Sequence, residues 1–276
     1  MSASNTTWSP PLQPPDYQKK AAREFRHALR GARSKEGAPV RRIFASDPDV
    51  DKPALASLLS GAGGRGGGRG GQVRIKLLLS LLWVCSAAPY TTQRPASAFA
   101  ALLGLDDYQD SGSRRIQQAL RDLADRGFVR VQQQGAHSPT IELLSETGNG
   151  SRYTSPVEAY NTLSRKEGTS AAELRAHRYF RVPTAYWADG WVSQLSGAAT
   201  AMYLAMLAEK SPKATEVWFS PSRAEARFGL AASTRKAGIK ELQEAGAIAT
   251  TSRSVSETGR IIDPTRRRNV YRLDIE

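Results

Sequence analysis

Polar and cationic side chains follow a helical spacing in the segment 112–126. Its apolar residues recur on one face of the predicted helix, which turns the polar residues to the other face. Arginine can bond O6 and N7 of guanine, and glutamine can bond N6 and N7 of adenine, with about 1–3 kcal/mol of discrimination for each good pair. The alternative is a solvated helix face, on which Gln118 pairs with Asp122 and Arg121 with Asp125. The candidate contact residues are Ser111, Ser113, Arg114, Arg115, Gln117, Gln118 and Arg121.

The segment 233–245 offers a second, less complete set of such residues. Arg235 falls where the first segment has Ile116, so we expect its stem to be partly buried. Glu241 and Glu244 are predicted on the outward side, where they would repel phosphate and limit how deeply this helix can enter a groove. The candidates in this segment are Ser233, Thr234, Lys236 and Lys240.

Arginines also cluster on or beside a predicted hairpin between Thr250 and Asn269. A hairpin tip can enter the minor groove of a duplex or grip its backbone, and arginine is favoured in both places. Each neutralised phosphate adds about 0.9 to the log–log salt slope. The alternative is a solvated run of charges in a loop. The candidates are Arg253, Arg260, Arg266, Arg267 and Arg268.

The composition favours a polyanionic partner and disfavours catalysis. Lys+Arg 39 exceed Asp+Glu 26, which gives a formal net charge of +13, and the excess lies in residues 1–72 and 178–276. The single cysteine, Cys85, excludes an internal disulfide and a multi-cysteine metal site. The three histidines lie far apart, so the sequence lacks the His-x-His metal pair of a rolling-circle nickase. We expect a protein that is not an enzyme and that uses no metal and no cofactor.

The sequence predicts no membrane span and no secretory signal. The longest apolar stretch, from Ile75 to Cys85, contains Lys76 and is roughly half of the ~20 residues that a spanning helix needs. Residues 1–15 are polar and rich in proline, without an apolar central region. We therefore expect a cytoplasmic protein with no membrane partner.

Composition divides the chain into four parts. Residues 1–72 are predicted to be a basic, Pro/Gly-rich arm and linker that is largely disordered, followed by a first domain (73–147), a linker (148–177) and a second domain (178–276). Within the arm, residues 16–30 predict a short helix. It is either a basic arm that folds on DNA or a marginal, solvated helix.

Both predicted domains have the same order of elements: apolar helix, second helix, third helix, glycine and a pair of strands. In the first domain, we predict helices at about 73–87, 95–103 and 112–126 and strands at 128–132 and 140–143. In the second, we predict helices at about 196–210, 222–228 and 233–245 and strands at 217–219, 247–253 and 269–273.

The third helices and the residues after them form an internal repeat at an offset of 119 positions. In each copy, an apolar pair at i, i+3 packs the helix, a glycine supplies a left-handed turn after it, and an apolar residue begins the next strand. The matching residues are Leu120, Leu123, Gly127 and Val129 in the first copy and Ile239, Leu242, Gly246 and Ile248 in the second. Upstream, Gly104 and Leu105 match Gly229 and Leu230.

This order of elements resembles the winged helix-turn-helix. The segment 179–183, followed by Leu195, Ser196 and an Ala/Leu-rich helix, is similar to the start of winged helices in plasmid and phage replication initiators. The resemblance implies an α+β fold, mainly α with small antiparallel β wings, arranged as two tandem winged-helix domains. It further implies double-stranded DNA as the partner and a nucleoid- or plasmid-associated location.

The sequence leaves four hypotheses for the function of this protein. The first is a non-enzymatic, sequence-specific DNA-binding protein, most simply a transcriptional regulator. The second is a plasmid or phage replication initiator or partition protein that binds repeated sites. The third, a nuclease or relaxase, lacks its histidine pair. The fourth, a protein–protein winged-helix scaffold, is disfavoured by the net charge of +13.

The helix predicted at 73–87 is apolar on more than one stripe. Such a helix usually has partners on several sides, so it is expected to form a homodimer contact or an interdomain interface. The alternative is a helix buried centrally in its own domain. Trp187, Trp191 and Trp218 are predicted to be core and capping residues of the second domain.

Overall fold

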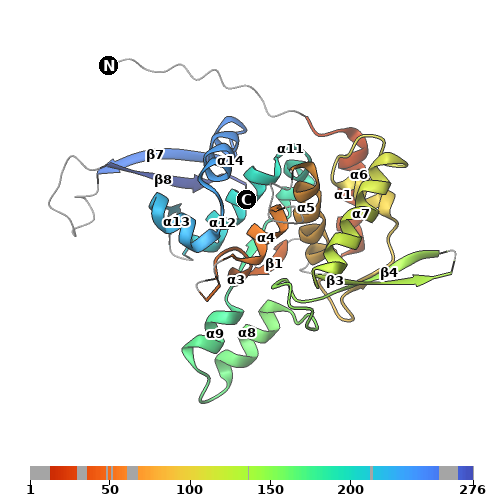
Figure 1. The fold of residues 1–276 in the computed structure, drawn as a ribbon, viewed down its shortest axis with the longest axis horizontal. Helices are drawn as coiled ribbons and strands as arrows, with labels where there is room; N and C mark the ends of the chain where they lie inside the picture. Colours follow the sequence, from red (N-terminus) through yellow and green to blue (C-terminus); the bar gives the residue numbers. More distant parts are fainter. Residues whose placement is uncertain are drawn as a thin grey trace.

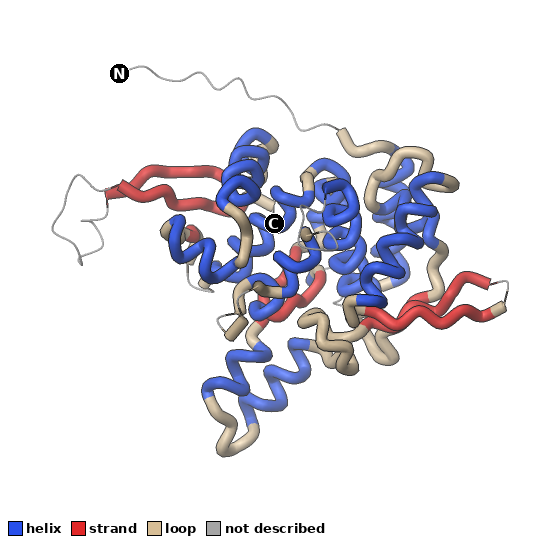
Figure 2. The backbone as a smooth tube through the Cα atoms, in the orientation of Figure 1, coloured by secondary structure: helices blue, strands red, loops and turns tan. Residues whose placement is uncertain are grey.

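The computed structural model describes residues 13–29, 36–47, 49–50, 52–60, 68–135, 137–211, 214–254 and 267–275. The fold is α+β, as predicted: helices predominate, and the described strands pair in small antiparallel sheets (Figure 2). Figure 1 shows two β-hairpins extending from opposite ends of a helical body.

The first 72 residues contribute ordered elements to the core, so the predicted disordered arm is wrong over its described part, whereas the helix predicted at 16–30 is confirmed as α1. These elements are α1 (Asp16–Ala28), β1 (Ala38–Arg41), α3 (Arg42–Ala45) and α4 (Ala54–Leu59). Phe25, Val40, Phe44 and Leu55 are almost completely buried. These apolar residues are separated by charged and small ones, and long-range burial outweighs the weak local propensity of such short segments.

The predicted helices and strands of the first domain are confirmed, with small shifts at their ends. The structure has α5 (Gly68–Val84), β2 (Thr91–Thr92), α6 (Ala96–Leu102), α7 (Ser111–Asp125), β3 (Val129–Gln134) and β4 (His137–Leu143). The strands form a sheet in the order β2-β4-β3, in which the short β2 had not been predicted.

The predicted linker 148–177 contains a helical hairpin, α8 (Pro156–Arg165) and α9 (Ala171–His177), which protrudes from the body (Figure 1). Both helices begin with a serine cap. Ser155 accepts a hydrogen bond from the backbone of Glu158, and Ser170 forms a reciprocal capping box with Glu173.

The second domain has the predicted elements, with small shifts at their ends: α12 (Gly197–Glu209), β6 (Glu216–Val217), α13 (Pro221–Phe228), α14 (Ala232–Glu244), β7 (Ile248–Ser254) and β8 (Arg267–Leu273). It also has β5 (Tyr179–Val182), α10 (Ala185–Ala188) and α11 (Trp191–Gln194), which had not been predicted. Its sheet order, β6-β8-β7, is the order of the first sheet.

The internal repeat is confirmed down to single hydrogen bonds. Gly127 and Gly246 both have φ of +72°, the left-handed conformation that glycine adopts without strain. The residue after each glycine donates its backbone N–H to the helix: Phe128 to Leu123 and Ala247 to Leu242, both at 2.9 Å. The third helix therefore ends in the same turn in both copies.

The duplication begins further upstream than the sequence indicated. The series strand, short helix, short helix, long helix occurs as β1-α3-α4-α5 and again as β5-α10-α11-α12. β1 and β5 also pair with each other antiparallel, with Val40 opposite Phe180. We call β1 to β4 with their helices the first repeat and β5 to β8 with theirs the second repeat. The predicted boundary at residue 73 is thus corrected to about residue 38.

The apolar helix α5 is buried between the two repeats. It contacts α12, the equivalent helix of the second repeat, as well as α4, α7 and β1. The Trp83 ring stacks on that of Trp187 with centroids 4.5 Å apart, and the Trp187 indole N–H donates to the Ser80 hydroxyl at 3.1 Å. One hydrophobic core runs through both repeats. Of the two contacts expected for residues 73–87, the structure shows the one between the two parts of this chain, because α12 and its neighbours already cover the apolar sides of α5; a homodimer stays a prediction.

Candidate nucleic-acid interface

The helix α7 is anchored by its apolar face and leaves its polar face open. Ile116, Ala119 and Leu123 are buried, whereas most of the predicted contact residues are exposed. Ahead of the helix, the Asp107 carboxylate accepts a hydrogen bond from the Ser111 backbone N–H at 3.0 Å, which lowers the pKa of Asp107. The exposed predicted residues are Ser111, Arg114, Arg115, Gln117, Gln118 and Arg121, and Ser113 is half-buried.

Two of these residues interact with carboxylate side chains of the same chain. Arg114 forms an ion pair with Asp110, and both side chains are 68% exposed. The Gln118 amide donates to Asp122 at 2.8 Å, as the alternative interpretation predicted. Ion pairs this exposed contribute about 0–1 kcal/mol, so Arg114 can exchange its partner at little cost.

A groove of about 630 Å³ lies between α7 and the hairpin β3/β4; we call it the first groove. Ser113, Gln117 and Arg121 line it from α7, and Gln133 and His137 line it from the hairpin. Arg94, just before α6, completes the wall.

The sequence analysis missed Arg94, Gln133 and His137 because it placed the contacts of the first domain on the helix α7, and these residues lie before α6 and in the hairpin β3/β4. The position of Arg94 directly before Pro95, at the start of a predicted helix, was the one available signal.

The helix α14, which is equivalent to α7 in the second repeat, turns one cation and one carboxylate inward. Arg235 is 7% exposed, donates to the carbonyl of Leu230 and pairs with Glu225 at 3.1 Å, which confirms its partly buried stem. Glu241 accepts hydrogen bonds from the backbone N–H of Ser196 at 2.6 Å and from its hydroxyl.

The prediction that Glu241 faces outward is therefore wrong: it holds the N-terminus of α12. The Glu241 carboxylate is stabilised there because the N-terminus of a helix attracts negative charge. Glu244 does lie outward, 3.6 Å from Lys240. Among the predicted residues of α14, Ser233, Lys236 and Lys240 are exposed and Thr234 is half-buried.

A second groove of about 460 Å³ borders α14 at equivalent positions. At the offset of 119, Lys236 and Lys240 of the second groove replace Gln117 and Arg121 of the first. Phe219 and Tyr271, whose rings stack at 5.4 Å, line the second groove, whereas no Phe, Tyr or Trp that the structure describes lines the first. The two grooves thus share their place in the repeat and differ in chemistry.

Those candidate arginines of the second hairpin that the structure describes each contact a nearby side chain of the second repeat. Arg253 pairs with Glu216 at 2.7 Å, and Arg267 donates to the Ser252 hydroxyl at 3.0 Å. Arg268 lies 4.3 Å from the centroid of the Trp218 ring. Arg253 and Arg267 remain exposed and Arg268 is half-buried. The candidates Arg260 and Arg266 lie outside the described residues.

Trp218 is 46% exposed, so its prediction as a core residue is wrong. It follows the edge strand β6 and lies under Arg268 instead of in the core. Trp187 is buried as predicted, and Trp191 is partly buried against the core.

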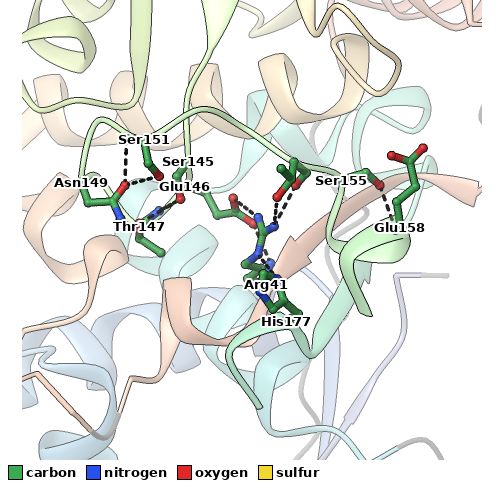
Figure 3. A network of polar contacts seen from close by, with 10 residues as sticks. Arg41, Ser145, Glu146, Thr147, Asn149, Ser151, Ser155, Glu158 and His177 are labelled. Carbon is green, nitrogen blue, oxygen red and sulfur yellow. Dashed lines mark hydrogen bonds and ion pairs between the residues drawn. The ribbon is translucent and has the colours of Figure 1, made fainter. Parts of the chain in front are cut away.

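A buried polar network fixes the end of the first hairpin to the rest of the body (Figure 3). Arg41 of β1 pairs with the fully buried Glu146 at 2.7 Å and donates to the carbonyl and hydroxyl of Thr154, both at 2.8 Å. Its Nε donates to Nδ1 of His177 at 3.4 Å. Burial raises the pKa of Glu146, and Arg41 opposes that shift. The network joins β1, the connection after β4 and the end of α9.

No model of a known protein family, no curated protein sequence and no solved structure matches the chain. Among the described residues, no helix has both the length and the apolar character that crossing a membrane requires.

Proposed function

We propose that the chain is a tandem winged-helix protein that binds double-stranded DNA sequence-specifically, without catalysis, and that it acts as a transcriptional regulator. The observation that carries this proposal is the duplicated site. α7 and α14 each end in the same glycine turn, each border a groove beside a hairpin, and each present exposed cations to it. The net charge of +13 favours the same partner.

In this proposal α7 enters the major groove with its N-terminal half at the base edges. Arg114 then exchanges Asp110 for a guanine, and Gln118 exchanges Asp122 for an adenine. A phosphate backbone lies along the first groove, where Arg94 and Arg121 neutralise it.

A second candidate function is a plasmid or phage replication initiator or partition protein that binds repeated sites. The difference between α7 and α14 favours it. At the offset of 119, Ser233 and Ala237 replace Arg114 and Gln118. Two unlike helices in one packed body fit an asymmetric site, and a protein of this kind needs no two-fold symmetric operator. A footprint of several phased repeats supports this function, and a single operator beside a promoter supports the first.

The experiment is to capture genomic DNA on the purified, nuclease-treated protein, to sequence it, and to measure affinity for the recovered site. Replacing Arg114 and Gln118 by alanine should relax sequence preference, because base contacts are lost. Replacing Arg267 and Arg268 should lower affinity evenly across sequences and flatten the salt slope by about 0.9 for each lost phosphate contact. If the wild-type protein shows no salt-dependent duplex binding, the proposal fails and a protein–protein scaffold replaces it.

A further inference from the structure

The helix α1 packs on α6 of the first repeat and on α10 of the second. Its Ala21, Ala22 and Phe25 are buried, and the Phe25 ring lies 5.2 Å from that of Phe99 in α6. The buried Gln18 amide donates to the carbonyls of Leu102 at 3.3 Å and Trp187 at 2.9 Å. These contacts fix the backbone of α1 before any ligand binds. A ligand that binds the cations on its exposed side therefore does not have to order a new segment.

Both ends of α1 adjoin the walls of the first groove. At its start, the Tyr17 ring stacks on that of Tyr108 at 5.0 Å, and the next residue, Gln109, lines the groove. Toward its end, the Arg94 guanidinium, also in the groove wall, lies 4.3 Å from the centroid of the Phe25 ring. In Figure 1, α1 accordingly lies beside α6.

The exposed side of α1 carries Lys20, Arg23 and Arg26. None of the three forms an ion pair with another residue that the structure describes; Asp16 pairs with Lys19 instead, at 3.8 Å. Glu24 is the other acidic residue of the helix. These cations thus lie on a helix whose two ends adjoin the walls of a groove that already contains Arg94 and Arg121.

We propose that Lys20, Arg23 and Arg26 form a phosphate-binding surface for duplex DNA, next to the segment read by α7. The proposal rests on the proposed function. The physical reason is that the first helix of a helix-turn-helix crosses the DNA backbone, and α1 covers that helix, α6, so it meets the backbone beyond the groove. Such contacts add affinity and no sequence preference.

The test is the double variant Arg23→Ala, Arg26→Ala, in which alanine preserves helix formation. The matched control is Arg165→Ala, Lys166→Ala, which removes the same charge from the protruding hairpin α8/α9, where both residues are exposed. Affinity for the captured duplex is measured by fluorescence anisotropy between about 0.1 and 1 M salt. We expect the salt slope of the α1 variant to fall by about 1.8, with roughly 60-fold weaker binding at 0.1 M salt than wild type and near-equal binding at 1 M. Sequence preference should not change.

Three outcomes would overturn the inference. If wild type binds the duplex and the α1 variant behaves like the control, α1 does not contact the backbone, and the proposed function stands. If the control loses as much affinity as the α1 variant, the loss reflects net charge alone. If the α1 variant changes sequence preference, these residues read bases. Failure of the proposed function itself is distinguishable, because wild type would then bind no duplex.

Discussion

Replacing Lys76 by methionine should stabilise the protein. Lys76 lies within α5 between Ile75 and Leu77 and is 2% exposed. Burial lowers its pKa to about 7 from the ordinary 10.5; Glu241 partly opposes this shift and Arg115 adds to it. One pKa unit corresponds to about 1.4 kcal/mol, so a gap of about 3.5 units means that keeping this lysine buried costs on the order of 5 kcal/mol at pH 7 and below. Methionine has a similar length and no charge, so the variant should gain several kcal/mol.

The gain should depend on pH in a defined direction. Between about pH 7 and 10.5, Lys76 is deprotonated in the folded protein and protonated in the unfolded chain. The unfolded state therefore binds more protons, and wild-type stability rises with pH by up to about 1.4 kcal/mol per unit. The variant lacks this term, so its advantage shrinks as pH rises from 7. Burial raises the pKa of Cys85 to about 12, which lowers stability above its ordinary pKa, but this term is common to both proteins and cancels in the difference.

The assay is urea unfolding of both proteins between pH 6 and 9.5, with Lys166→Met as the control for an exposed lysine. The control should change stability by less than about 0.5 kcal/mol. An advantage that is absent at pH 7, or that stays constant with pH, would refute the reasoning. It would mean that Glu241 compensates the ammonium group of Lys76 in the folded protein.

The remaining predictions concern the buried network and the duplicated turn. Glu146→Gln breaks a buried ion pair and should lower the free energy of unfolding by about 3–5 kcal/mol. Glu142→Gln breaks an exposed pair and should cost at most about 1 kcal/mol; equal losses in urea unfolding would contradict this. Gly246→Ala should cost roughly 1–2 kcal/mol, because only the left-handed backbone opposes it. Gly127→Ala should cost more, since its Cβ would lie 2.9 Å from the backbone nitrogen of Gly150, and equal melting temperatures for the two variants would argue against that packing.

The local elements followed from the sequence because their causes are local. The i, i+3 apolar pairs and the glycines at 127 and 246 specify a helix, its end and the following strand within about ten residues. The buried Arg235 was also predictable, since it occupies an apolar position of the repeat. The same short-range signals gave most of the candidate contact residues.

The tertiary structure decided which surfaces those elements cover. Glu241 has an outward position in the helical pattern, yet the N-terminus of α12 captures it. The composition of α5 indicated partners on several sides. Only the tertiary structure shows that one of these partners is α12, the equivalent helix of the second repeat. Residues 38–45 have little local signal and pack against segments more than a hundred positions away, namely β5 and α12. Contacts at that sequence separation depend on the whole fold, because no local pattern encodes which distant apolar face will close over another.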